Sequence, residues 1–216
     1  MGNEKIYAVE NPGYRKIGKI YQSYKVLCKY IDMDEEGVEI SKLEENQVDI
    51  AHISPSHHYP TGIVMPVSRR YELLGWAAKS ENRYIIEDDY DSELRLSGQP
   101  IPTLQSMDVS DKVIYMNTFT KTLASTVRIS YMILPRELFQ QYYKKLSFYS
   151  CTVSNFEQYT LAKFIEEGYF EKHINRLRNY YHNKRNTIVE TIKKKSFEPI
   201  CFHFRRRGRS SFSDED

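Results

Sequence analysis

Short apolar runs alternate along the chain with longer stretches in which apolar residues recur at helical spacing. Apolar runs of about four to eight residues are typical of strands buried on both faces, and the longer stretches are typical of amphipathic helices. This alternation predicts an α/β fold with a mainly parallel sheet flanked by helices. Strands are expected at residues 6–9, 24–31, 48–53, 84–87, 113–119 and 128–134, and helices at 13–22, 68–80, 136–147 and 156–167.

Two of the helical stretches carry further detail. Ser68 is expected to cap its helix, and Tyr71, Leu74 and Ala78 follow at helical spacing as apolar positions. A longer, heavily charged helical pattern runs from about residue 170 to 194. It predicts an amphipathic connecting helix that lies over a domain surface. The apolar positions of this long helix are Ile174, Leu177, Tyr181, Ile188 and Ile192.

The two ends of the sequence differ from its middle. The first expected strand begins almost at Met1, and residues 197–204 start what reads as a new strand. We therefore expect the fold to be incomplete at both ends. The tail, residues 205–216, begins with arginines and ends with acidic residues. It is consistent with a basic patch or localisation signal and with a solvated terminus.

Composition narrows the class of protein. The net charge is +2 over 216 residues, which gives no general case for nucleic-acid binding. No apolar run approaches the roughly 18 residues that span a membrane, and the first residues lack the pattern of a signal peptide. The three cysteines, Cys28, Cys151 and Cys201, are far apart and odd in number, as expected for reduced thiols. These features predict a cytoplasmic protein with no membrane partner.

Lys121 follows an apolar run that ends in hydroxyl side chains. A lysine can form a Schiff base with an aldehyde, and a lysine after a buried strand emerges where open α/β sheets bind their ligands. Thr118, Thr120 and Thr122 supply hydroxyls beside it. Arg128 supplies a planar cation a few residues later. Together these groups are suited to hold a phosphate dianion through charge-assisted hydrogen bonds.

An acid and a phenol precede this lysine. Asp88 ends the expected strand at 84–87, and Tyr90 lies two residues on, on the same side of an extended segment. A carboxylate opposite a pyridine nitrogen keeps that nitrogen protonated and makes the ring an electron sink. The tyrosine hydroxyl is placed to reach an oxygen substituent of the same pyridine ring. An acid, a tyrosine, a lysine and an arginine, in this order along the chain, are the parts needed to hold pyridoxal 5'-phosphate.

Each of these residues also has a simpler interpretation. A lysine after a strand is commonly a solvated loop residue. The acidic run 87–89 is commonly a solvated turn or a divalent-metal site. His52, His57 and His58 lie close together but match no zinc-ligand spacing, so we expect structural or surface roles for them and no metal site.

Four segments are the most specific in the chain: ENPGY at 10–14, SPSHHYPTGIVMP at 54–66, EDDYDSE at 87–93 and TFTKTL at 118–123. They resemble the aminotransferase-like domain of MocR-type transcription regulators, a branch of the GntR group. That domain has the fold-type I architecture of aspartate aminotransferase. The resemblance covers about residues 8–185. It implies the large domain of a fold-type I transferase that depends on pyridoxal phosphate.

The resemblance also implies a role for each candidate residue. Lys121 matches the lysine that holds the cofactor as an internal aldimine. Asp88 matches the aspartate at the pyridine nitrogen, and Tyr90 matches the tyrosine near the ring oxygen. Thr120 and Arg128 match phosphate contacts. The implied domains are a partial cofactor-binding domain at 1–167, a connecting helix at 168–195, and the start of a small domain with a charged tail at 196–216.

Some positions depart from the family pattern. Asn117 stands where glycine is usual, which predicts an altered backbone, and His58 stands where glutamine is usual. Thr120 replaces a serine and keeps its hydroxyl. We find no counterpart of the winged-helix DNA-binding domain, the glycine-rich phosphate loop, the ring-stacking aromatic residue or the arginine for the substrate carboxylate. Direct DNA binding is therefore not expected from this chain.

These matches imply a domain of aminotransferase type that binds pyridoxal phosphate and an amino acid or amine, and that pairs as a homodimer. Two alternatives stay open. One is an effector-sensing domain of a transcription regulator that binds its ligand without turnover. The other is a truncated fragment with no function of its own. The identity of the substrate does not follow from the sequence.

Overall fold

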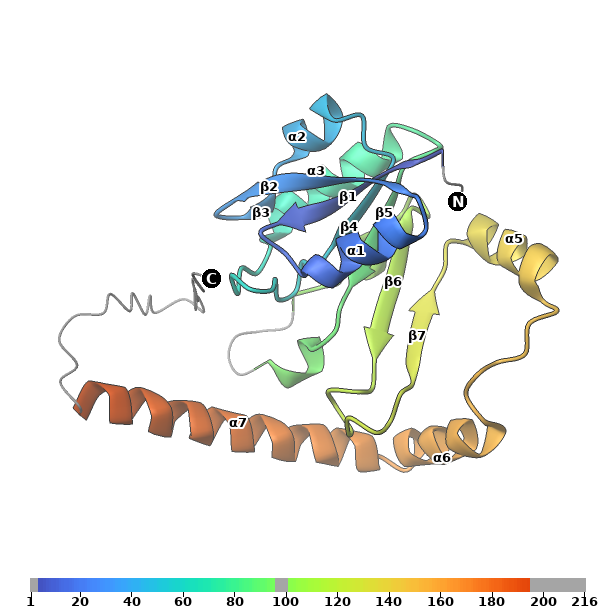
Figure 1. The fold of residues 1–216 in the computed structure, drawn as a ribbon. Helices are drawn as coiled ribbons and strands as arrows, with labels where there is room; N and C mark the ends of the chain where they lie inside the picture. The colour runs from blue at the N-terminus through green and yellow to red at the C-terminus, as the bar shows by residue number, and fades with distance from the viewer. Residues whose placement is uncertain (1–3, 96–100, 195–216) are drawn as a thin grey trace.

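The structure is a computed structural model that describes residues 4–95 and 101–194. Its centre is a seven-stranded sheet in the order β3-β2-β1-β4-β5-β6-β7 (Figure 1). The strands are β1 (Ile6–Asn11), β2 (Leu27–Asp34), β3 (Gly37–Val38), β4 (Ile50–Ile53), β5 (Tyr84–Asp88), β6 (Val113–Thr118) and β7 (Ser130–Ile133). Strands β2, β1, β4, β5 and β6 are parallel to their neighbours in this series, and β3 and β7 are antiparallel additions at the two edges. The prediction of an α/β fold with a mainly parallel sheet is confirmed.

Helices cover both faces of the sheet. Successive side chains of a strand point to opposite faces, so each strand contributes to two cores. Ile85 belongs to the core beneath α2, α3 and α4, whereas its neighbour Ile86 belongs to a second core that includes side chains of α1 and α5. The helices are α1 (Arg15–Ser23), α2 (Ile40–Glu45), α3 (Val67–Ala78), α4 (Leu104–Met107), α5 (Arg136–Leu146), α6 (Asn155–Glu166) and α7 (Tyr169–Lys194), and η1 (Ser92–Leu94) is a 3-10 turn.

The prediction for helix α3 was wrong in two respects. The helix begins directly after Pro66 with no side-chain cap, so Ser68 lies inside its first turn. Tyr71 is 62% exposed and Ala78 is also exposed, so they do not form the buried face. The buried face contains a charged residue, which apolar spacing cannot reveal. Its members are Arg70, Leu73, Trp76 and Ala77.

Helix α7 lies over the domain surface only along its first half. Ile174 is buried at 4% exposure, whereas Tyr181 and Ile188 are 42% and 51% exposed. Figure 1 shows the reason: α7 passes below the lower end of the sheet, and its second half extends beyond the sheet. The expected apolar face of α7 is therefore buried in its first turns and exposed in its second half.

Several expectations concern residues that the structure does not describe. The expected strand at 197–204, the tail at 205–216 and Cys201 lie outside the described residues. Cys28 and Cys151 are free thiols. Within the described ranges, no helix has the length and apolar character needed to cross a membrane. The cytoplasmic location stays a prediction.

Candidate functional site

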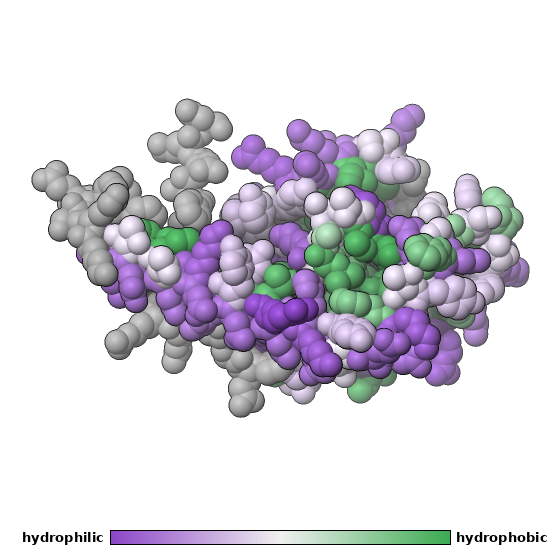
Figure 2. Space-filling view, turned by 90° about the horizontal axis from the view of Figure 1, so that it is seen from below, coloured by the Kyte–Doolittle hydropathy of each residue, from purple (hydrophilic) through white to green (hydrophobic). Residues whose placement is uncertain are grey.

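The candidate residues come from two neighbouring parallel strands. Asp88 is the last residue of β5 and stands beside Met116 of β6, and Lys121 lies in the loop after β6, three residues beyond its last residue. Parallel strands end at the same edge of a sheet, so both side chains emerge there. Figure 2 shows the molecule from below, with apolar side chains gathered near the middle and hydrophilic ones around them.

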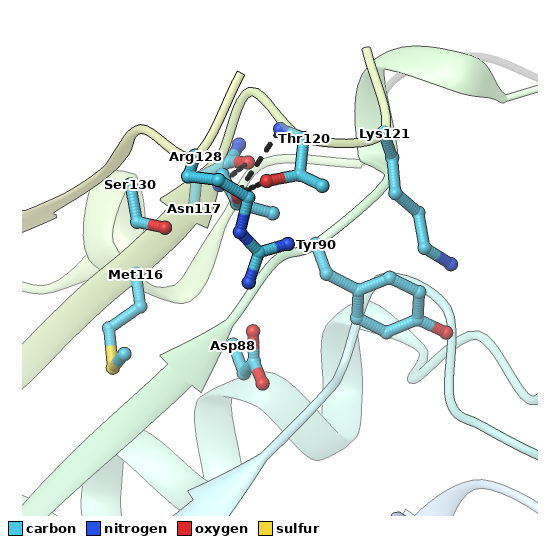
Figure 3. Close-up of a pocket in the computed structure, with 9 residues that line it drawn as sticks. Asp88, Tyr90, Met116, Asn117, Thr120, Lys121, Arg128 and Ser130 are labelled. Atoms are coloured by element: carbon cyan, nitrogen blue, oxygen red, sulfur yellow. Dashed lines mark hydrogen bonds between the residues drawn. The ribbon is translucent and has the colours of Figure 1, made fainter. Parts of the chain in front are cut away.

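A cavity of about 350 Å³ lies at this edge (Figure 3). Every residue predicted to bind cofactor lines it, and Met116, Asn117 and Ser130 complete its wall. In Figure 3 the guanidinium of Arg128 points toward the carboxylate of Asp88, and the amine of Lys121 lies beside the ring of Tyr90. The predicted residues are Asp88, Tyr90, Thr118, Thr120, Lys121 and Arg128.

Hydroxyl groups hold the loop between β6 and β7 in a compact shape. The Thr118 hydroxyl donates to Oγ1 of Thr120 at 2.9 Å, and the Thr120 hydroxyl donates to the carbonyl of Val127 at 3.1 Å. Both side chains remain on the cavity wall. Thr122 was wrongly expected to join them. It is 1% exposed and its hydroxyl donates to the carbonyl of Phe119, so it faces away from the cavity.

Lys121 and Tyr90 form a cation–π pair. The Nζ atom of Lys121 lies 4.7 Å from the ring centroid of Tyr90. The Tyr90 hydroxyl donates to the carbonyl of His57 at 2.8 Å. Burial, followed by the charges of Asp91 and Asp88, raises the pKa of this phenol above its usual range. Tyr90 is therefore a protonated hydrogen-bond donor at neutral pH.

The acidic run that contains Asp88 is not a solvated turn. Glu87 is fully buried and accepts hydrogen bonds from the backbone amides of Leu104 and Gln105 at 2.8 and 2.9 Å. Asp89 is 2% exposed and accepts from the hydroxyl of Tyr115 at 2.8 Å. Alternation along the strand sends these two carboxylates away from the cavity and leaves Asp88 facing it.

A second cavity of about 410 Å³ adjoins the first and shares Asp88, Tyr90 and Lys121 with it. Tyr14 and Tyr59 line it, with ring centroids 6.1 Å apart in an edge-to-face arrangement. Aromatic surface is thus present in the described chain, although sequence reasoning placed the ring-stacking residue outside it. The signal was available, because Tyr14 belongs to one of the four specific segments.

The histidines have three different environments. His52 bonds to the hydroxyl of Tyr21 at 2.7 Å and also lines the second cavity, with Nε2 3.6 Å from Oδ2 of Asp88. His57 is half exposed and bonds to Asp91 at 2.9 Å, and this hydrogen bond raises the pKa of the imidazole. His58 is buried, with Nε2 3.4 Å from the carboxylate of Glu10. Among the described residues, no group of three or more histidine, cysteine, aspartate or glutamate side chains is placed to hold a metal ion.

Burial sets the protonation of the pair formed by Glu10 and His58. It raises the pKa of Glu10 to about 8 and lowers the pKa of His58 to about 4, so both are neutral at pH 7. Glu10 also accepts a hydrogen bond from the amide of Ser54 at 3.0 Å. This contact joins β1 to the loop after β4, where Gly62 turns the chain with a φ of 70°.

Asn117, which stands where glycine is usual, is a regular strand residue. It lies in β6 without a positive φ, and it is 4% exposed. Its side chain is what differs from glycine, since the amide donates to Glu93 at 2.8 Å and to the hydroxyl of Tyr115 at 3.0 Å.

A sequence profile of the aminotransferase class I and II family matches residues 6–201. The HTH-type transcriptional regulator YdeL of Bacillus subtilis (strain 168) is 43% identical over 94% of this chain and 42% of that protein. The probable rhizopine catabolism regulatory protein MocR of Rhizobium meliloti is 32% identical over 84% of this chain and 36% of that protein. The crystal structure of Pyrococcus horikoshii kynurenine aminotransferase superposes with a TM-score of 0.78 at 30% identity, over 91% of this chain and 50% of that chain.

Fold and sheet topology together define the class as the large domain of fold-type I aminotransferases. The chain belongs to the aminotransferase class I and II family. The resemblance to MocR-type regulators that the sequence predicted is confirmed by relatives of that kind. The chain spans about two fifths of the length of these curated relatives.

Proposed function

We propose that this chain is a pyridoxal-phosphate-binding domain of aminotransferase type whose second ligand is an amino acid or an amine. One observation carries the proposal. Lys121, Asp88 and Arg128 reach the same cavity from the carboxyl edge of a parallel sheet. An amine, a carboxylate and a guanidinium in one cavity match the three chemically distinct ends of this cofactor.

The residues of the two adjoining cavities fit the cofactor group by group. Arg128, with Thr118 and Thr120, is suited to hold the phosphate as a charge-assisted anion site. Asp88 is suited to hold a protonated ring nitrogen, and Tyr14 offers an aromatic face. When bound, pyridoxal phosphate supplies an aldehyde and an electron-withdrawing ring.

Lys121 has two successive roles in the proposal. Its amine would hold the cofactor, because an amine condenses with an aldehyde with loss of water and pyridoxal phosphate would supply that aldehyde. When it is not bound to the cofactor, the same amine would be placed at the cavity to accept and return a proton as a general base. The ring of Tyr90 beneath Nζ keeps the ammonium form near the cavity through the cation–π contact.

The test is cofactor loading followed by reduction. The purified wild-type chain, mixed with pyridoxal phosphate and treated with borohydride, is expected to gain the cofactor's mass on the peptide that contains Lys121. Lys121→Ala should lose this gain, whereas Lys145→Ala, on the exposed helix α5, should keep it. A wild type that shows neither visible absorbance nor mass gain would refute the proposal.

A regulatory version of the same site is favoured by the names of the relatives. YdeL and MocR are both named as regulators, and together they match most of this chain. In this version the cavity senses an amino ligand and turnover is absent. Incubation with a panel of amino acids distinguishes a sensor from an enzyme. A sensor changes its absorbance without releasing keto acid, and an enzyme releases keto acid. A fragment without function would show neither, and would not unfold cooperatively.

We also propose that the chain pairs as a homodimer. Large aromatic side chains are exposed on α6 and the segment before it, including Phe148 at 75%, Phe156 at 79% and Tyr159 at 74%. Exposed apolar surface of this kind marks interaction sites. Sedimentation velocity is expected to give twice the chain mass, and Phe156→Ser with Tyr159→Ser should shift it toward the monomer.

A further inference from the structure

Helix α7 contacts the loop that carries Lys121 through one side of its first turns. The ring of Phe170 meets the ring of Phe119 edge-to-face, with centroids 5.7 Å apart. Ile174 follows four residues later and is buried at 4% exposure. Arg178 follows four residues after that, on the same helix face. This face is in contact with the domain, and the residues beyond it are mostly exposed.

Arg178 continues the contact through the 3-10 turn η1. Its Nε donates to the carbonyl of Glu93 at 2.7 Å. The carboxylate of Glu93 in turn accepts a hydrogen bond from the amide of Asn117 at 2.8 Å. Within the described residues, the other carboxylate oxygen, Oε2, is buried without a donor. The link from α7 to β6 therefore passes through the main-chain oxygen of Glu93 and one oxygen of its carboxylate.

Asn117 is placed where this link meets the cavity. It lines the cavity and its side-chain oxygen accepts from the amide of Thr118, the residue that starts the hydroxyl-bonded loop. Its amide also donates to the hydroxyl of Tyr115, which donates to Asp89 next to Asp88. Hydrogen bonds in such a buried series reinforce one another, so a loss at one member affects the others.

We propose that Asn117 and Glu93 are positioning residues that couple helix α7 to the loop carrying Lys121. The first turns of α7 are attached to this loop at Phe119 and, through Glu93, at Asn117. The second half of the helix extends away from the sheet (Figure 1). A change in the direction of α7 is therefore transmitted to the cavity wall, and a change at the cavity is transmitted to α7. Coupling of this kind is reciprocal.

Hydrogen–deuterium exchange with mass spectrometry tests the coupling in the full chain without cofactor. Asn117→Gly and Glu93→Ala are expected to speed exchange about fivefold or more in two peptides together, 118–124 and 170–178. Glu93→Gln keeps an acceptor oxygen and should restore most of the protection. Glu171→Ala, an exposed carboxylate on the same helix, is the matched control and should leave the loop peptide unchanged.

The reciprocal variant is Phe170→Ala, which removes the contact of α7 with Phe119 and leaves Glu93 and Asn117 in place, and it is expected to speed exchange in peptide 118–124. If Asn117→Gly fails to fold, as judged by circular dichroism, Glu93→Ala and Phe170→Ala still decide the question. Faster exchange confined to the mutated element, or equal behaviour of Glu93→Ala and Glu93→Gln, would overturn the proposal. Because no cofactor is present, these outcomes are separate from the success or failure of cofactor loading.

Discussion

The two walls of the cavity come from regions of very different packing. Asp88 and Asn117 belong to β5 and β6, whose residues are mostly buried and none of which is exposed. Arg128 and Ser130 belong to the region of β7, α5 and α6, in which every residue of β7 is exposed and neither helix has a buried residue. The chemistry of the site thus depends on a rigid wall and a weakly supported wall. We expect contacts of the well-packed region around β5 and β6 to contribute most of the free energy of unfolding.

Matched leucine truncations would break this comparison most directly. Leu73→Ala removes a fully buried side chain of α3 and is expected to lower the free energy of unfolding by about 2–5 kcal/mol. Leu146→Ala, on the 39% exposed residue at the end of α5, should cost less than about 1 kcal/mol. Urea unfolding measures both. Equal costs would mean that the α5 region is packed as firmly as the core.

The pH dependence of stability should also originate in the packed region. The folded-state pKa of Glu10 is raised to about 8, so the folded chain holds a proton that the unfolded chain releases. Stability is therefore lost as pH rises toward 8. Below pH 6.5 this trend is opposed by His58, whose lowered pKa of about 4 makes stability fall as pH drops.

The window for this effect lies between pH 6.5 and 8, where Glu87, with its pKa raised to about 7, and His57, with its raised pKa, contribute in the same direction. There Glu10 contributes a loss of at most about 2 kcal/mol, because each pH unit corresponds to about 1.4 kcal/mol per proton. Glu10→Gln is expected to reduce the decline measured by urea unfolding across this window, and the contributions of Glu87 and His57 should remain. Glu166→Gln, on exposed helix α6, is the control and should leave the slope unchanged. An unchanged slope in Glu10→Gln would contradict the assignment.

Loss of a helix cap should have different consequences in the two regions. Ser154 and Glu157 form a capping box at the start of α6, and the Thr103 side chain accepts from the amide of Ser106 at the start of α4. Each Ser154→Ala or Thr103→Ala substitution should cost about 1 kcal/mol of helix stability. We expect Thr103→Ala to lower global unfolding stability and Ser154→Ala to speed exchange within α6 alone. A loss of global unfolding stability in Ser154→Ala would show that the two regions unfold together.

The smallest effect is expected for the ion pair on α6. Lys163 and Glu166 lie 2.8 Å apart, but both side chains are more than two-thirds exposed. Lys163→Ala should change the free energy of unfolding by less than about 0.5 kcal/mol, and added salt should remove even that difference. A larger change would show that α6 is held by charge and not by its cap.

Much of the fold could be predicted because its central strands are buried on both faces. Such strands read as apolar runs, so the strands from β4 to β6 were found within a few residues of their ends. Helix α4 was missed because it has four residues and depends on the carboxylate of Glu87, which approaches from a distant strand. No local pattern contains that information.

The residues of the candidate site also divide into those that the sequence could predict and those that it could not. Lys121 and Asp88 could be placed together because both follow parallel strands, whose ends share one edge. His52 and Tyr14 were missed because their position depends on how β1 and β4 align with β5, which a single sequence does not state. The expectation for Thr122 failed because a hydroxyl next to a catalytic candidate can turn either way within a loop.

Trp76 has a consequence for how this molecule is observed. It is the only tryptophan of the chain, it is 1% exposed, and it packs in the core beneath α3 with Arg83 4.9 Å from its ring. Its fluorescence therefore reports on one region and is silent about β7, α5, α6 and the far part of α7. Circular dichroism at 222 nm weights those helices instead. A gap between the two unfolding curves would reveal the weaker wall separating first, from a single unlabelled sample.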